Sequence, residues 1–147
     1  MDTILVAAEA SWIRSQVLNA FVSPDQRVVE VERGQDVRGA VDEYDPSVVI
    51  LDMQIGNMGG IAAALDLRLE AGEGRLPDVP ILLLLDRQAD HFLAKRADVD
   101  GTLVKPLDAG LLRRAVKQLK DIDRSERSAA PSLQDPDEPE AVELTEA

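Results

Sequence analysis

A chain of 147 residues, 45% of them apolar, can form one domain with a core of its own, which aliphatic side chains must fill because aromatic residues are only 3%. The absence of cysteine excludes a disulfide framework and a thiol nucleophile. The net charge of −12, from 16 basic and 28 acidic residues, disfavours a general nucleic-acid binder. No apolar stretch approaches the length of a membrane span, so we expect a cytoplasmic protein.

The first 123 residues alternate apolar runs with segments of helical spacing. The runs are rich in Val, Ile and Leu and predict buried strands over residues 3–8, 27–32, 47–52, 79–85 and 101–104. Apolar residues at helical spacing predict a first helix around Ile13 to Phe21 and a last helix around Leu112 to Leu119, with Asp108 as N-cap of the last. Three more helices are expected over residues 36–44, 58–71 and 87–96. Five such units predict an α/β fold, a doubly wound five-stranded parallel sheet of the flavodoxin-like type.

The composition changes from Arg124 onward. Residues 124–147 hold seven acidic and two basic residues, a net charge of −5, with three prolines and no apolar period. Such a segment cannot bury enough apolar surface to offset the entropy lost on ordering. We therefore expect a folded domain over residues 1–123 and a disordered acidic tail over residues 124–147.

Three charged residues follow three of the predicted strands. Asp52 ends the run Val-Val-Ile-Leu, Lys105 follows Thr-Leu-Val, and Glu9 follows Ile-Leu-Val-Ala-Ala. Open α/β sheets bind their ligands outside the carboxyl ends of the strands, so these side chains are expected to converge. One lysine and two acids there could form a small pocket that holds a divalent cation and receives a phosphoryl group.

These segments resemble the receiver domain of response regulators in bacterial two-component signalling. The resemblance covers residues 2–121 and is carried by residues 4–10, 46–60, 79–85 and 101–107. The segment around Asp52 and the Val-Lys-Pro sequence are the most specific, because they occur together in the expected strand order. The resemblance implies a receiver-type fold and a role in phosphorelay signal transduction.

The resemblance also implies a role for each residue of the pocket. Asp52 would accept a phosphoryl group from a phosphohistidine donor, giving a phosphoprotein, and Lys105 would contact a phosphoryl oxygen. Glu9, Asp52 and the backbone carbonyl of Gln54 would bind Mg²⁺, which keeps several waters in such sites. A cis peptide bond would join Lys105 to Pro106.

The sequence departs from the family pattern around this pocket. The first of the two acids usual after the first strand is Ala8, so Glu9 stands alone and we expect a weakened Mg²⁺ site. The usual Ser or Thr at the end of the fourth strand is Leu85, or Asp86 if the register slips by one residue, and Thr102 replaces the usual aromatic of the fifth strand. The hydroxyl-aromatic switch is thus absent, which indicates an atypical receiver. We expect Asp86 to cap the fourth helix.

Other interpretations stay open at this point. Asp52 could be a solvated or helix-capping acid at a strand end, Glu9 a helix cap, and Lys105 a structural partner of Asp52 that contacts no phosphate. The alternative function is a phosphate-independent adaptor, a pseudo-receiver with a vestigial pocket. A small α/β enzyme that uses Asp52 and Lys105 on a metabolite is the weakest alternative, because a Gly-rich loop, a cysteine and a pocket histidine are missing, and we do not expect an enzyme.

Nothing after residue 123 can form an output domain, so we interpret the chain as a stand-alone, single-domain response regulator that acts through protein contacts. The resemblance implies a histidine kinase or phosphotransfer protein as donor and an effector protein on the face of the fourth helix, fifth strand and fifth helix. That region is locally basic, with Arg87, Lys95, Arg96, Arg113, Arg114, Lys117 and Lys120. Direct contacts with nucleic acid or a membrane are not expected, and a homodimer is left open.

Overall fold

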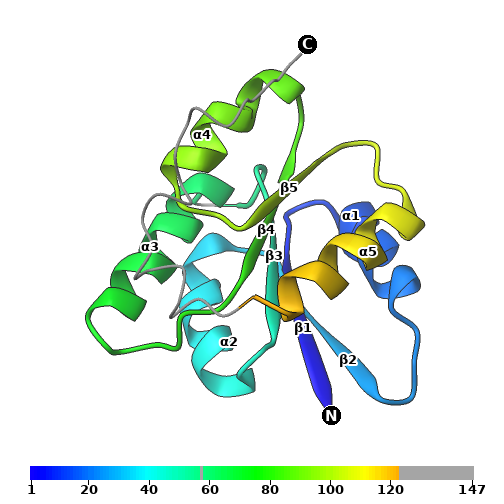
Figure 1. Cartoon of the computed structure of the whole chain (residues 1–147), viewed down its shortest axis with the longest axis horizontal. Coiled ribbons are helices and arrows are strands. Elements are labelled where there is room, and N and C mark those ends of the chain that lie inside the picture. Colours follow the sequence, from blue (N-terminus) through cyan, green and yellow to red (C-terminus); the bar gives the residue numbers. More distant parts are fainter. Residues whose placement is uncertain (57, 123–147) are drawn as a thin grey trace.

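The computed structural model describes residues 1–56 and 58–122 (Figure 1). These residues form one five-stranded sheet in the order β2-β1-β3-β4-β5, with every neighbouring pair parallel. The strands are β1 (Asp2–Ala7), β2 (Gln26–Val31), β3 (Val48–Asp52), β4 (Ile81–Leu85) and β5 (Gly101–Val104). The tail expected over residues 124–147 lies outside the described residues.

Helices cover both faces of the sheet, as Figure 1 shows. The helices α1 (Ser11–Ala20) and α5 (Ala109–Lys120) pack on one face. The other face carries α2 (Val37–Tyr44), α3 (Gly60–Gly72) and α4 (His91–Arg96), with short 3₁₀ turns η1 (Gly34–Asp36) and η2 (Gln88–Asp90) before α2 and α4. The predicted fold, a doubly wound parallel sheet of the flavodoxin-like, receiver type, is confirmed.

The two-sided cover explains why the central strands are apolar without alternation. Side chains of a strand point to opposite faces in turn, so Leu51 and Leu83 join the core under α2, α3 and α4. Ile50 and Leu82 join the core under α1 and α5. All residues of β3 and β4 are buried, and the chain leaves these strands at the edge where the charged residues lie.

The largest difference from the predicted elements concerns the fourth helix. We expected a helix over residues 87–96 capped by Asp86, but the α-helix begins only at His91, after the turn η2. The prediction of Asp86 as a cap is wrong, because its carboxylate is held by Lys105 and Gln54. The cap predicted for α5 is confirmed, since Asp108 accepts a hydrogen bond from the amide of Leu111 at 2.9 Å.

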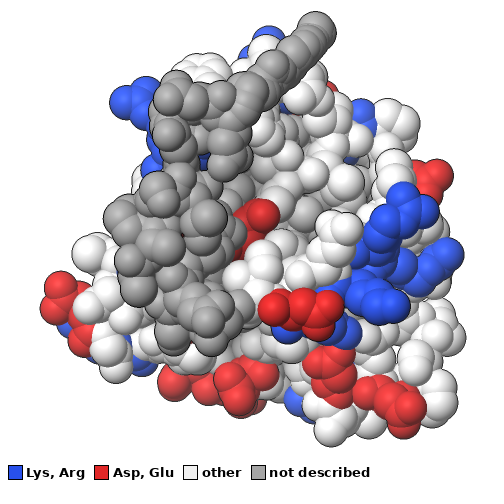
Figure 2. Space-filling view, viewed as in Figure 1, with Lys and Arg blue, Asp and Glu red and all other residues white. Residues whose placement is uncertain are grey.

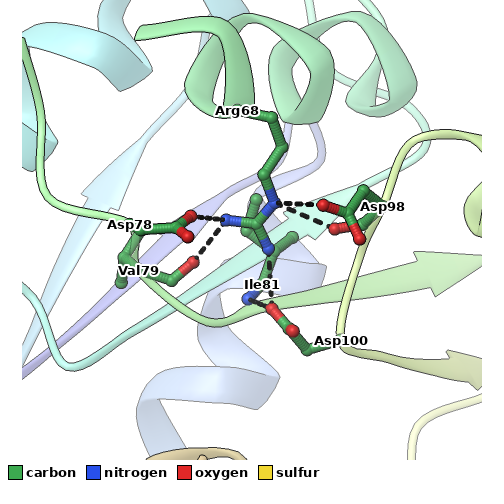
Figure 3. Close-up of polar contacts among 6 residues, drawn as sticks. All are labelled: Arg68, Asp78, Val79, Ile81, Asp98 and Asp100. Atoms are coloured by element: carbon green, nitrogen blue, oxygen red, sulfur yellow. Dashed lines mark hydrogen bonds and ion pairs between the residues drawn. The ribbon is translucent and has the colours of Figure 1, made fainter. Parts of the chain in front are cut away.

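A largely buried arginine side chain fixes the amino ends of β4 and β5 to α3 (Figure 3). Arg68 is 11% exposed at its side chain and contacts the side chains of Asp78, Asp98 and Asp100 and the carbonyls of Val79 and Asp98. The fully buried carboxylate of Asp100 accepts from Arg68 at 2.7 Å and from the amide of Ile81 at 2.8 Å. We call these residues the Arg68 network; they lie at the opposite end of the strands from Asp52.

Candidate functional site

Asp52 is the last residue of β3, and its side chain is only 1% exposed. The neighbouring strand fixes its height, because Asp52 pairs with Leu84 of β4. Helix α3 begins directly against it, since a Cβ added at Gly60 would overlap the carbonyl oxygen of Asp52. The interpretation of Asp52 as a solvated acid is therefore wrong: this carboxylate is held inside the protein.

Lys105 reaches Asp52 from the end of β5. Its Nζ lies 2.5 Å from Oδ1 of Asp52 and 2.8 Å from Oδ1 of Asp86. Strand register explains the second contact, because Leu85 pairs with Val104 and the next residues on the two strands are Asp86 and Lys105. The Lys105-Pro106 peptide bond is cis, as the resemblance implied.

Asp86 is held through both of its carboxylate oxygens. Oδ1 accepts from Lys105, and Oδ2 accepts from Nε2 of Gln54 at 2.9 Å. These hydrogen bonds, that of Lys105 first, lower the pKa of Asp86, so it is ionised at neutral pH. Burial alone would lower the pKa of Lys105, but its hydrogen bonds to Asp52 and Asp86 outweigh this and raise it. The pocket thus contains one ammonium group between two carboxylates.

Glu9 lies on the rim of the pocket and is exposed. Its amide donates to the carbonyl of Gln54 at 3.1 Å, which ties the loop after β1 to the loop after β3. Its carboxyl carbon lies 3.9 Å from the point where a Cβ at Gly56 would stand. Glu9 is not the cap of α1, since the N-cap position belongs to Ala10, which has only a methyl group.

Arg14 is a buried residue near the site that the sequence interpretation did not identify. It donates to the carbonyls of Ala8 at 2.7 Å and Glu9 at 2.9 Å, and pairs with Glu30 at 3.2 Å. These contacts fix the loop that carries Glu9. A basic residue one turn into the first helix is a weak sequence signal, because most such residues face solvent.

One atom of the site has no hydrogen bond. Oδ1 of Asp52 contacts Lys105 and accepts from the amide of Gln54 at 3.1 Å, whereas Oδ2 is the one buried side-chain oxygen or nitrogen in the described part of the chain that has no hydrogen-bond partner. Leaving a buried acceptor unsatisfied costs about 1–3 kcal/mol, and more for a charged group. Such a group in a native protein calls for an explanation, and a catalytic role or a bound ion is one that fits a carboxylate at this edge of the sheet.

The oxygens at this edge are of the kind that Mg²⁺ binds. They are the orphaned Oδ2 of Asp52, the carboxylate of Glu9 and the carbonyl of Gln54. Over residues 1–56 and 58–122, no group of three or more Asp, Glu, His or Cys side chains could hold a metal ion. Two side-chain carboxylates and one backbone carbonyl are thus the protein ligands that an ion could use here, and the weakened Mg²⁺ site expected from Ala8 stays a prediction.

The two positions that depart from the family pattern have other structural roles. Leu85 is fully buried in the core on the side of α2, α3 and α4. The hydroxyl of Thr102 lies 3.2 Å from Nδ1 of His91, which links β5 to the first residue of α4. Burial, and then the charge of Lys95, lower the pKa of His91. Leu85 therefore lacks the hydroxyl group usual at its position, and Thr102 lacks the aromatic ring usual at its own.

A doubly wound parallel sheet with a buried aspartate beside a lysine at its carboxyl edge defines a receiver-type signalling domain. The family model described as "Response regulator receiver domain" matches residues 4–117. This chain therefore belongs to the response regulator receiver domain family, the signalling modules of two-component systems. Membership implies interaction with histidine kinases or phosphotransfer proteins, and receiver domains generally bind Mg²⁺ at their acidic pocket.

Individual relatives agree with this assignment. The transcriptional regulatory protein DegU of Brevibacillus brevis is 29% identical over 92 residues, which are 61% of this chain and 37% of that protein. The response regulator domain of Thermotoga maritima CheB has a TM-score of 0.69 and 20% identity, and the match covers 84% of this chain and 98% of that one. Chemotaxis response regulator CheY4 of Vibrio cholerae has a TM-score of 0.70 and 20% identity, covering 81% and 98%. At such identities the solved structures show the fold alone.

Among the described residues, no helix is long and apolar enough to cross a membrane.

Proposed function

We propose that this chain is an atypical response regulator receiver that accepts a phosphoryl group on Asp52. The observation that carries the proposal is Oδ2 of Asp52, a buried carboxylate oxygen without a hydrogen-bond partner, beside an ammonium group 2.5 Å from Oδ1. Oδ2 attacks phosphorus, the phosphorus–nitrogen bond of the phosphohistidine breaks, and the donor imidazole leaves with the electron pair of that bond. Asp52 becomes an acyl phosphate.

The rest of the pocket neutralises charge and positions the reacting groups. Lys105 carries a point charge on a flexible side chain. Its ammonium group can leave Oδ1 of Asp52 and pair with a phosphoryl oxygen. The amide of Gln54 holds Oδ1 at 3.1 Å and so fixes the plane of the carboxylate. A bound Mg²⁺, held by Asp52, Glu9 and the carbonyl of Gln54, would supply further neutralisation of the phosphoryl charge.

The surface proposed to transmit the signal is the face of α4, β5 and α5. Helix α5 exposes Arg113, Arg114 and Lys117, and Figure 2 shows basic side chains gathered over this helix in an otherwise acidic protein. A groove of about 240 Å³ lies between β5, an edge strand, and α5. Leu111 at its border is 48% exposed. A protein partner with an acidic rim around apolar side chains would fit this surface.

Phosphorylation by a small-molecule donor tests the proposal directly. We expect incubation with acetyl phosphate and Mg²⁺ to add the mass of one phosphoryl group to the intact protein, and the Asp52→Asn variant to remain unmodified. Asp25→Asn is the matched control, because Asp25 is exposed and follows α1 at the opposite end of the sheet. Equal labelling of the Asp52→Asn variant, or no labelling of the native chain, would contradict the assignment.

A further inference from the structure

The acid that follows β4 has no part in the function proposed above, yet it is bound to the lysine on which that function depends. Asp86 is the first residue after β4, and strand register places it beside Lys105. Its Oδ1 lies 2.8 Å from Nζ of Lys105, nearly as close as Oδ1 of Asp52 at 2.5 Å. The ammonium group is therefore shared between a reacting carboxylate and a second one.

We infer that Asp86 restrains phosphorylation of this site: its carboxylate occupies Lys105 in the place of a phosphoryl oxygen, and an incoming phosphoryl group must displace it. The inference rests on the proposed function of Asp52 and names a regulatory residue of the same pocket. Asp86 binds Lys105 before phosphorylation and competes with the phosphoryl group for it. Asp86 does not contact the reacting bond.

Charge and geometry support this competition. The side chain of Lys105 is 14% exposed, so water competes only weakly for its three donors. Asp86 also accepts from Nε2 of Gln54 at 2.9 Å, so two contacts must be broken before its side chain swings away from Lys105. A phosphoryl group on Asp52 would bring further negative charge close to the carboxylate of Asp86, because both groups face Lys105. These like charges repel each other strongly at this range in a partly buried site. Acceptance then requires that the contact between Asp86 and Lys105 be broken.

The contact between Asp86 and Lys105 resembles the contact that a phosphoryl group on Asp52 would make with Lys105. A carboxylate oxygen on the ammonium group of Lys105 is chemically similar to a phosphoryl oxygen on it, since both are anionic acceptors. Removal of the negative charge at residue 86 leaves Lys105 with one carboxylate, that of Asp52, and removes the competitor of the incoming group. We therefore expect the initial rate of labelling by acetyl phosphate to rise on the order of tenfold in Asp86→Asn, as one charge-assisted hydrogen bond no longer has to be displaced.

The experiment compares initial labelling rates by intact mass for the native chain and for Asp86→Asn, Asp86→Ala and Asp86→Glu. The Asn and Ala variants should be labelled faster, and the Glu variant, which keeps the charge, should remain close to the native rate. The matched control is Asp42→Asn, which removes one exposed negative charge on α2, away from Lys105. Thermal melting of each variant shows whether it is folded.

The pattern of labelling separates this inference from the proposed function of Asp52. If the native chain is labelled on Asp52 but Asp86→Asn is labelled equally fast or more slowly, this inference is wrong and the proposed function stands. If neither the native chain nor any variant is labelled, the proposed function fails, and this inference fails with it.

Discussion

The two ends of the sheet carry clusters of similar composition, carboxylates around a single cation, but they treat their carboxylates differently. At the amino ends, Asp100 accepts from both Arg68 and the amide of Ile81. At the carboxyl ends, Asp52 is equally buried, yet its Oδ2 has no hydrogen-bond partner in the described part of the chain. Both clusters direct two donors onto one carboxylate oxygen, Oδ2 of Asp100 and Oδ1 of Asp52, but among the described residues only Asp52 keeps a buried oxygen without a hydrogen bond.

The two clusters also differ in their cation, which is an arginine at the amino ends of the strands and a lysine at the carboxyl ends. The planar guanidinium of Arg68 directs its donors along fixed lines to several oxygens at once, which suits a permanent connection between α3 and the starts of β4 and β5. The ammonium of Lys105 is a point charge on a flexible stem, which can exchange one oxygen for another. The comparison teaches that a buried ion pair can serve stability or chemistry, and that the unsatisfied oxygen distinguishes the two.

The largest effect should come from Arg68→Ala. This change leaves the fully buried carboxylate of Asp100 without its cation, which typically costs about 3–5 kcal/mol. Urea unfolding would measure the loss in free energy of unfolding. The control is Arg38→Ala, which removes the exposed arginine of α2 that pairs with Asp66, a residue of the same helix as Arg68. The folded fraction should still be labelled by acetyl phosphate. If Arg68→Ala costs no more than Arg38→Ala, the network is not the structural cluster that we describe.

The opposite sign is expected for Asp52→Asn in the same urea titrations. Asparagine keeps an oxygen for the amide of Gln54 and removes the charge of a carboxylate with an orphaned oxygen, while Lys105 keeps Asp86. The free energy of unfolding should stay the same or rise by about 1 kcal/mol, as often happens when a functional group is replaced. A loss comparable to that of Arg68→Ala would show that Asp52 is a structural acid.

The smallest effect concerns pH and His91. Its pKa in the folded protein lies below the ordinary value of 6.5, because burial and Lys95 disfavour the charged ring. The unfolded chain therefore binds the proton more readily, so this contribution to stability is present above pH 6.5 and is lost as pH falls through the lower, folded-state pKa. His91→Gln should flatten the pH dependence in that window. Identical pH profiles for the two proteins would contradict the assignment.

The fold could be predicted from the sequence because its central strands are apolar on both faces. Runs such as Val48–Leu51 identify buried parallel strands, and Asp108 marks the start of α5 by ordinary capping chemistry. The start of α4 could not be predicted, because the turn η2 before His91 is polar and resembles a helix start. The same ambiguity led to the wrong role for Asp86.

The site was predictable only in part. Residues at strand ends are recognisable from the sequence, but which of them meet depends on strand order and register. The contact of Asp86 with Lys105 follows from the pairing of Leu85 with Val104, which no local pattern contains. An acid directly after a buried strand can join the pocket or cap the following helix. Only the pairing register of the neighbouring strands distinguishes these two roles.

The central claim, that Asp52 accepts a phosphoryl group, is tested most directly by locating the modified residue. Borohydride reduces an acyl phosphate of aspartate to homoserine, so reduction after treatment with acetyl phosphate marks the acceptor for peptide mass mapping. We predict that the reduced residue is at position 52, and that Asp52→Asn yields none. Reduction at Glu9 or Asp86, or no reduced residue in the native chain, would contradict the account.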